Sequence, residues 1–235
     1  MIIVRPSEQR GHADHGWLRA KHSFSFAEYY DPAEMGWGVL RVINEDRVAP
    51  GMGFGTHGHR DMEIVTYILS GALEHKDSLG NGGVIRRGEV QRMSAGKGIM
   101  HSEFNPLPDQ ETHLLQIWIE PAQRGTRASY EQQELAVDGM RGRWRLVASP
   151  DGADGSTTIG QDARLWASQL APGSALDYPL AAGRLGYVQV ISGRLAVNGV
   201  ELSAGDGAKI AEESALHFMA TDEAEILLFD LPPAH

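Results

Sequence analysis

The chain has 235 residues, a formal net charge of −10 and no cysteine. The acidic balance excludes a general binder of nucleic-acid backbones, which needs clustered lysine and arginine, and the lack of cysteine excludes disulfides, thiolate nucleophiles and cysteine-based metal sites. The N-terminus has no signal-peptide pattern and no window approaches a membrane span, so we expect a cytoplasmic protein without a membrane segment.

Short apolar runs bounded by glycine, proline, asparagine or aspartate recur along the chain and predict β-strands. We expect strands at residues 38–44, 63–69, 114–119, 165–170, 185–191, 195–197 and 225–231. Helical signal is sparse, and only residues 130–137 are expected to form one or two helical turns. With 28 glycines and 11 prolines favouring many tight turns, the pattern predicts an all-β fold.

An internal repeat is present. Residues 67–71 read Tyr-Ile-Leu-Ser-Gly and residues 189–193 read Gln-Val-Ile-Ser-Gly, and a turn of glycine and an acidic residue follows at 88–89 and at 205–206. Each half therefore reads as strand, turn, strand, turn, strand, which is typical of the repeated hairpins of a small β-barrel.

We predict two small jelly-roll-type β-barrels in one chain, at residues 1–145 and 146–235. The Gly/Ser/Asp-rich stretch 149–160 is the expected connection between them. The strands of the second barrel contain one histidine, His217, and no His-x-His pair. We expect His217 to be packed or hydrogen-bonded, so the duplication is expected to have kept one chemical site, in the first barrel.

Two pairs of potential metal ligands stand at alternate positions in the first half. His57 and His59 form one pair, and His101 and Glu103 form the other. Side chains at i and i+2 of a strand point to the same face, so each pair can reach one point in space. Three imidazoles and a carboxylate suit a divalent first-row metal ion. Glu63 is a competing carboxylate, because its spacing of four from His59 would also keep it on the same face of a strand.

Longer motifs surround these positions. The segments in question are residues 21–26, 56–69, 74–78, 88–103 and 115–118. Together they resemble the pirin family of the cupin superfamily, and the run 41–46 makes the chain most similar to bacterial pirins of the quercetin 2,3-dioxygenase type. Gly58 departs from the family pattern, in which the metal loop usually reads His-Pro-His.

The resemblance implies a bicupin fold with one divalent transition metal ion held by His57, His59, His101 and Glu103. Iron is the ion that it implies first, with nickel, copper, manganese, cobalt and zinc as alternatives, because such ligands suit all of them to differing degrees. It assigns Glu63 to a hydrogen bond or salt bridge behind the ligands, and we expect Glu103 to act also as the catalytic proton acceptor.

The activity implied by the resemblance is that of a dioxygenase, in which quercetin or a related flavonol or phenolic enol reacts with O₂ and loses its heterocycle. A second hypothesis is a metal- or redox-gated regulator that binds a protein partner with little catalysis. A third is a hydrolase or isomerase that uses the ion as a Lewis acid, since a metal set does not fix function. We expect a monomer that makes no direct contact with nucleic acid.

Three other histidines receive separate interpretations. For His22 two interpretations stay open: a contact at the mouth of the site and a structural hydrogen bond to a loop. His75 stands in a polar run and is expected to be solvated or in a turn, and His113 is expected to make an interior hydrogen bond. The aromatic side chains that are candidates for either pocket walls or plain core are Phe24, Phe26, Phe54 and Phe104.

Overall fold

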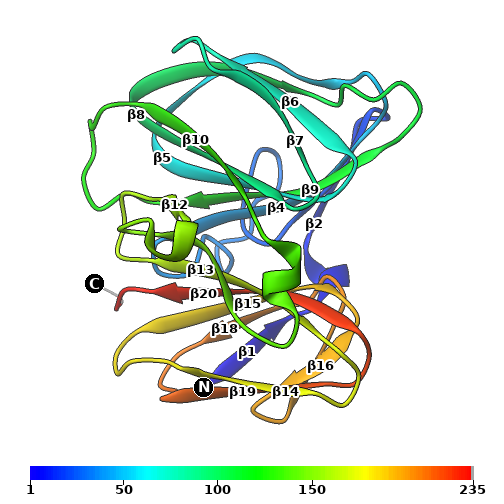
Figure 1. Ribbon diagram of the computed structural model, residues 1–235, viewed down its shortest axis with the longest axis vertical. Coiled ribbons are helices and arrows are strands. Elements are labelled where there is room, and N and C mark those ends of the chain that lie inside the picture. The colour runs from blue at the N-terminus through cyan, green and yellow to red at the C-terminus, as the bar shows by residue number, and fades with distance from the viewer. Residues whose placement is uncertain (234–235) are drawn as a thin grey trace.

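The computed structural model describes residues 1–233, so the last two residues of the predicted second barrel lie outside the described residues. The described chain forms three β-sheets arranged in two lobes (Figure 1). The short 3₁₀-helices among these residues are η1 (Ser7–Gln9), η2 (Val137–Met140) and η3 (Ala153–Gly155). The prediction of an all-β, two-part jelly-roll fold is confirmed.

The first half forms a nine-stranded sheet with two long strands near its centre. In order across the sheet its strands are β2 (Gly11–Asp14), β3 (Leu18–His22), β4 (Leu40–Val48), β9 (Thr112–Ile119), β5 (Gly53–Ser70), β8 (Glu89–Phe104), β6 (Ala72–Asp77) and β7 (Gly82–Arg86), with β10 (Ser129–Glu134) also paired to β8. The long strands β5 and β8 are antiparallel, and their register places His57 opposite His101. The two predicted ligand pairs therefore lie on neighbouring strands.

The second half consists of two sheets with an apolar interior between them. The strands of the seven-stranded sheet are β1 (Ile2–Arg5), β18 (Gly207–Ile210), β15 (Leu185–Ser192), β20 (Ala224–Leu231), β13 (Arg164–Leu170), β11 (Arg145–Ser149) and β12 (Thr157–Thr158). Those of the four-stranded sheet are β14 (Ala175–Pro179), β19 (Ala215–Ala220), β16 (Arg194–Val197) and β17 (Val200–Ser203). Val188 and Leu228 of the first sheet and Leu195 and Phe218 of the second are buried in one cluster, so burial of apolar surface holds the sheets together.

The chain begins in the sheet of its second half. Strand β1 pairs antiparallel with β18, and Figure 1 shows this first strand in the same lobe as β15 and β20. The division into units 1–145 and 146–235 stays a prediction about folding units. Strand β1 belongs to the first unit by its residue numbers but pairs with a strand of the second. A further apolar cluster with Tyr67 and Ile117 from the first half and Leu165 and Phe229 from the second joins the two lobes.

The internal repeat is visible in the structure. Turns at Gly71 and Gly193 join β5 to β6 and β15 to β16, and both glycines have a positive φ, 80° and 76°, which side chains rarely adopt. Strand β18 follows β17 as β8 follows β7, but β18 has 4 residues where β8 has 16. Strand β19 takes the place of the part of β8 that carries His101 and Glu103, because β19 pairs with β16 as β8 pairs with β6. In this register Leu216 and Phe218 of β19 stand where His101 and Glu103 stand in the first half.

One prediction about the region between the halves needs correction. Residues 130–134 belong to β10 and are not helical, because β10 pairs with the first residues of β8, from Glu89 to Ser94, and only Val137 of the predicted segment is helical, as the first residue of η2. Pairing to a strand outweighs a weak local preference. The predicted connection 149–160 contains η3 and the short strand β12.

Candidate metal centre

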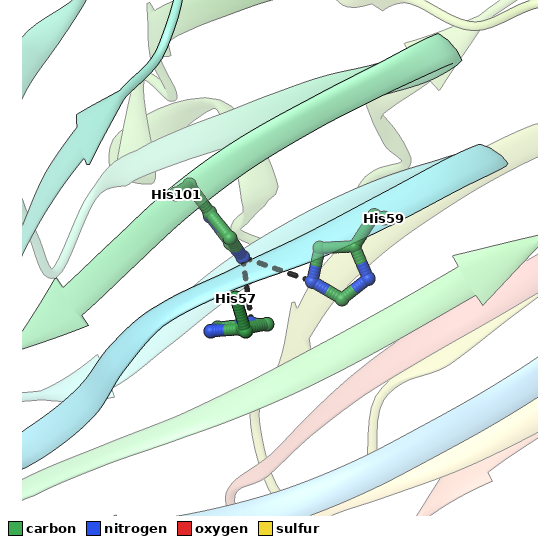
Figure 2. A group of neighbouring side chains, drawn as sticks. All are labelled: His57, His59 and His101. Atoms are coloured by element: carbon green, nitrogen blue, oxygen red, sulfur yellow. Dashed lines mark hydrogen bonds between the residues drawn. The ribbon is translucent and has the colours of Figure 1, made fainter.

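Three imidazoles point toward one another from β5 and β8 (Figure 2). The Nε2 atom of His101 lies 2.9 Å from that of His59 and 3.0 Å from that of His57. His57 and His59 stand at alternate positions of β5, and the β5–β8 register brings His101 beside them. The alternation of His57 with His59 and the pairing of their strands thus produce the convergence predicted from the sequence.

The hydrogen bonds on the far sides of these rings fix which nitrogens carry protons. Nδ1 of His57 donates to the carbonyl oxygen of Gly55 at 2.7 Å, so Nε2 of the neutral ring is bare. Nε2 of His75 donates to Asp77 at 2.8 Å, which leaves Nδ1 of His75 to accept from Nδ1 of His101 at 3.4 Å. Nε2 of the neutral His101 is therefore bare as well.

Two unprotonated ring nitrogens that face each other at 3.0 Å repel through their lone pairs, and a bound cation removes this repulsion. A metal ion with two ligand nitrogens at about 2.1 Å and at right angles holds those nitrogens about 3.0 Å apart. The two measured separations around His101 match this value. The three histidines thus fit a divalent ion by their spacing around His101, and His57 and His101 fit it by tautomer as well.

The surroundings of the site keep the rings uncharged. Burial, with the other histidines adding to it, lowers the pKa of His101 to about 3. Burial and the nearby His57 lower the pKa of His59 to about 4. Neutral imidazole is the form that binds a metal ion, so these two rings are ready ligands at neutral pH.

Glu103 stands two residues beyond His101 on β8, and it lines the same cavity as the three histidines. Its carboxylate accepts hydrogen bonds from Nε2 of Gln116 at 2.7 Å and from Nε2 of Gln91 at 3.2 Å. A carboxylate has about four lone-pair sites, so two donors leave acceptor capacity for an ion. Its ligand atoms group with His75 and His101 rather than with all three converging rings, which makes its role as fourth ligand a proposal.

Glu63 does not share the face of His57 and His59, so the expectation from spacing is wrong here. The register between β5 and β8 shifts between His59 and Asp61, and Asp61 has a φ of 65°. This irregularity turns the following side chains over, as a β-bulge does. Glu63 accepts a hydrogen bond from Ser94 at 2.7 Å and lies against Gly160 of the second half.

His75 is the residue that sequence reasoning misjudged most. It is fully buried rather than solvated, and its ring stacks on Tyr130 of β10 with centroids 4.5 Å apart. Strand β6 pairs with β8 so that Asp77 lies opposite His101. Asp77, His75 and His101 form a hydrogen-bonded chain that ends at the metal-binding nitrogen. Such partners of a ligand histidine fix its tautomer and orientation.

The variant His75→Phe is expected to bind a divalent ion about 10–100-fold more weakly, the range typical for loss of a partner behind a ligand. Phenylalanine keeps the stacking on Tyr130 but cannot accept the proton of His101. Competition with a chelating dye measures the affinity. The matched control is His217→Phe, because His217 also pairs with an aspartate, Asp177, but lies in the second half. Equal affinities in wild type and His75→Phe would contradict the chain of hydrogen bonds.

A cavity of about 760 Å³ opens beside the three histidines. Its aromatic lining consists of Trp17, Phe26, Tyr29, Phe54 and Trp118. The Trp118 ring meets the His59 ring edge to face at 5.0 Å. Phe26 and Phe54 are thus the wall residues among the predicted candidates, whereas Phe24 is buried core and Phe104 faces outward.

Polar groups line the same cavity on β3, β4 and β9. His22 is buried and its Nδ1 is 2.7 Å from the Asn44 side-chain oxygen, so it is both hydrogen-bonded and part of the cavity. His113 makes the expected hydrogen bond, to Glu45 at 2.8 Å. Asp46 lines the cavity but was not singled out from the sequence. The alternation of Asn44 with Asp46 on a strand is the signal that points to it.

Comparison with known proteins decides the family. The pirin family model matches residues 3–119, and the model of the quercetinase C-terminal cupin domain matches residues 146–231. A curated quercetin 2,3-dioxygenase of Escherichia coli strain K12 is 48% identical over 233 residues, which cover 99% of this chain and 100% of that protein. The chain belongs to the pirin family. A pirin-like protein of Caulobacter vibrioides is 45% identical, covering 98% of this pirin and 99% of the relative.

The solved structures agree with this placement. The crystal structure of the bacterial pirin YhhW from Escherichia coli in complex with nickel(II) superposes with a TM-score of 0.95 at 48% identity, covering 99% of this pirin and 100% of that chain. That relative holds a divalent ion, and this pirin has a cluster of histidines able to hold one. Within residues 1–233 no helix is long and apolar enough to cross a membrane.

Proposed function

We propose that this pirin is a metal-dependent dioxygenase that acts on quercetin or a related flavonol or phenolic enol. The observation that carries the proposal is the position of the three-histidine cluster at the wall of a large aromatic cavity. Ligand sites are typically concave, mostly apolar and supplied with a few polar groups. The names of the curated relatives supply the reaction type, and the cavity supplies room for a planar ring system.

His57, His59, His101 and Glu103 would hold the ion. When bound, a divalent ion there supplies Lewis acidity and holds an acidic substrate oxygen and O₂ in reach of each other. Trp118 and Phe26 pack edge to face with centroids 5.4 Å apart and give the cavity an aromatic wall against which a flat ligand can lie. Burial of His101 and Glu103 lowers the local dielectric, which strengthens the electrostatic contacts that these two groups make.

Glu103 would accept the proton of the substrate hydroxyl. Gln91 and Gln116 hold its carboxylate in place with amide donors, and the hydroxyl of Tyr130 in turn donates to Gln91 at 3.2 Å. Deprotonation makes the ring electron-rich toward O₂. With a flavonol, both atoms of O₂ would enter the products and the heterocycle would open to a depside with release of carbon monoxide.

The test is turnover of quercetin by purified protein loaded separately with Fe(II), Ni(II), Cu(II), Mn(II), Co(II) or Zn(II). We expect loss of the flavonol absorbance, with O₂ uptake, for at least one of these ions. The variant His101→Ala treated with the same ion is the control and is expected to be inactive. No loss of absorbance with any ion would remove the substrate proposal and favour the alternative of a metal-gated protein-binding role.

A further inference from the structure

Asp46 stands apart from the other polar groups that line the cavity. Asp46 is 4% exposed, yet its carboxyl group makes no hydrogen bond to any of residues 1–233. Its neighbours differ in this respect, because Asn44 pairs with His22 and Glu103 receives two amide donors. Of the two buried carboxyl groups that line the cavity, Asp46 is thus left without a hydrogen-bond partner from residues 1–233.

Enclosing a carboxylate without a partner is costly. Burial, with the charges of Glu103 and Glu45 adding to it, raises the pKa of Asp46 to about 7. Native proteins satisfy nearly all their buried polar groups, so an unpaired one at the wall of a ligand cavity indicates a group that the ligand satisfies. A carboxyl group keeps an acceptor oxygen whether or not it is protonated. The complementary ligand group is therefore a hydrogen-bond donor.

The position of Asp46 separates this donor from the group that meets the metal. Asp46 lies on β4, and β9 stands between β4 and the histidine-bearing β5. The register places Asp46 level with Leu114 of β9 and Ile68 of β5, nine residues along β5 from His59. Asp46 therefore faces the cavity from another part of its wall than the three histidines. The intervening strand contributes Trp118 to the cavity wall, so the path between the two sites is partly aromatic.

We propose that Asp46 is a specificity residue that accepts a hydrogen bond from a second hydroxyl of an aromatic substrate, distinct from the oxygen that binds the metal. The inference rests on the proposed function, because it assumes that a phenolic ligand occupies this cavity. It narrows the substrate class to polyhydroxylated aromatics. An analogue without the second hydroxyl leaves Asp46 unpaired and is disfavoured for that reason.

The test compares two ligands and two variants. Quercetin and 3-hydroxyflavone share the 3-hydroxy-4-keto unit, but only quercetin carries further hydroxyls. Dissociation constants of metal-loaded protein are measured by quenching of tryptophan fluorescence, since Trp17 and Trp118 line the cavity. Asp46→Leu is expected to weaken quercetin binding roughly tenfold or more, the loss typical of a hydrogen bond to a charged group. Binding of 3-hydroxyflavone is expected to stay within about twofold.

Four controls separate recognition of the ligand from an effect on the protein structure. Asp46→Asn keeps an acceptor oxygen of the same size and is expected to retain most of the quercetin affinity. Asp46→Leu is expected to melt no lower than wild type, because it removes a desolvated carboxyl group that has no partner among residues 1–233, whereas a structural role predicts a lower melting temperature. The metal content of both Asp46 variants is expected to equal that of the wild-type protein. Asp109→Leu, at an exposed position outside the cavity, serves as the matched substitution.

The outcomes distinguish this inference from the dioxygenase proposal. If Asp46→Leu selectively loses quercetin binding but the wild-type protein does not turn quercetin over, the role of Asp46 in recognition is supported and the dioxygenase proposal is refuted. Turnover of quercetin with equal effects of Asp46→Leu on both ligands, or with no effect on either, would overturn the role of Asp46 alone. Failure of the wild-type protein to bind either ligand would overturn both.

Discussion

Replacing His101 by alanine is expected to empty the metal site while both halves of the protein stay folded. His101 supplies the nitrogen that lies within 3.0 Å of both other ligand nitrogens, so its loss removes the centre of the cluster. Affinity should fall by roughly a hundredfold or more, beyond the effect typical of partners behind a ligand. Turnover of the substrate should fall with it.

The fold should survive because its apolar cores do not include the ligands. The cluster that joins the halves and the cluster inside the second half contain none of the three histidines. Metal content per chain, circular dichroism and thermal melting check the expectation, with His217→Ala as the matched control on a histidine of the second half. Full metal content in both His101→Ala and His59→Ala would contradict the assigned site.

The isosteric pair Glu103→Gln and Glu63→Gln is expected to separate the two candidate carboxylates. Glu103→Gln should lower metal affinity about 10–100-fold, a loss at least as large as that for partners behind a ligand, because the neutral amide binds a cation less well than a carboxylate. Glu63→Gln should keep full metal content, because the Glu63 side chain lies on the opposite face of β5 and bonds to Ser94.

Metal titration of both variants beside wild type measures this difference, and quercetin turnover by the loaded proteins gives a second readout. Each substitution preserves the size of the side chain, so a change in packing does not account for a loss. If Glu63→Gln alone lowers the metal content, the choice of Glu103 as ligand is wrong.

Alternation along strands predicted the convergence of the histidines correctly. His57 and His59 are two residues apart, and a strand places such residues on one face. The sequence alone does not show where a strand changes face. The left-handed conformation of Asp61 interrupts the alternation between His59 and Glu63, and nothing in the residue types announces it, since aspartate only tolerates this conformation better than most residues.

Groups behind the ligands were harder to predict than the ligands. His75 and Asp77 belong to a polar run that resembles a solvated turn, and only the pairing of β6 with β8 buries them beside His101. Tyr130 lies on a segment for which local preference indicated a helix, and the pairing of β10 with β8 brings it onto His75. Contacts distant in sequence decide these positions, so tertiary structure overrides the local pattern.

The second half shows what the repeat conserved and what it did not. Both halves keep the glycine turns between corresponding strands. Strand β19 occupies the place of the ligand-bearing part of β8, but it has Leu216 and Phe218 where β8 has His101 and Glu103. His217 is exposed and paired with Asp177 at 2.6 Å, which confirms the expectation of a hydrogen-bonded histidine. The second half contributes to the site indirectly, through the apolar core shared with the first half.

The most direct test of the whole account is anomalous X-ray diffraction from crystals loaded with nickel(II), collected at the absorption edge of the metal. We predict a single strong peak in the first half, about 2.1 Å from Nε2 of His57, His59 and His101, with a Glu103 oxygen beside it and at least one side of the ion facing the aromatic cavity. A peak elsewhere, or an ion enclosed entirely by protein groups, would contradict a metal centre built for an aromatic substrate and O₂.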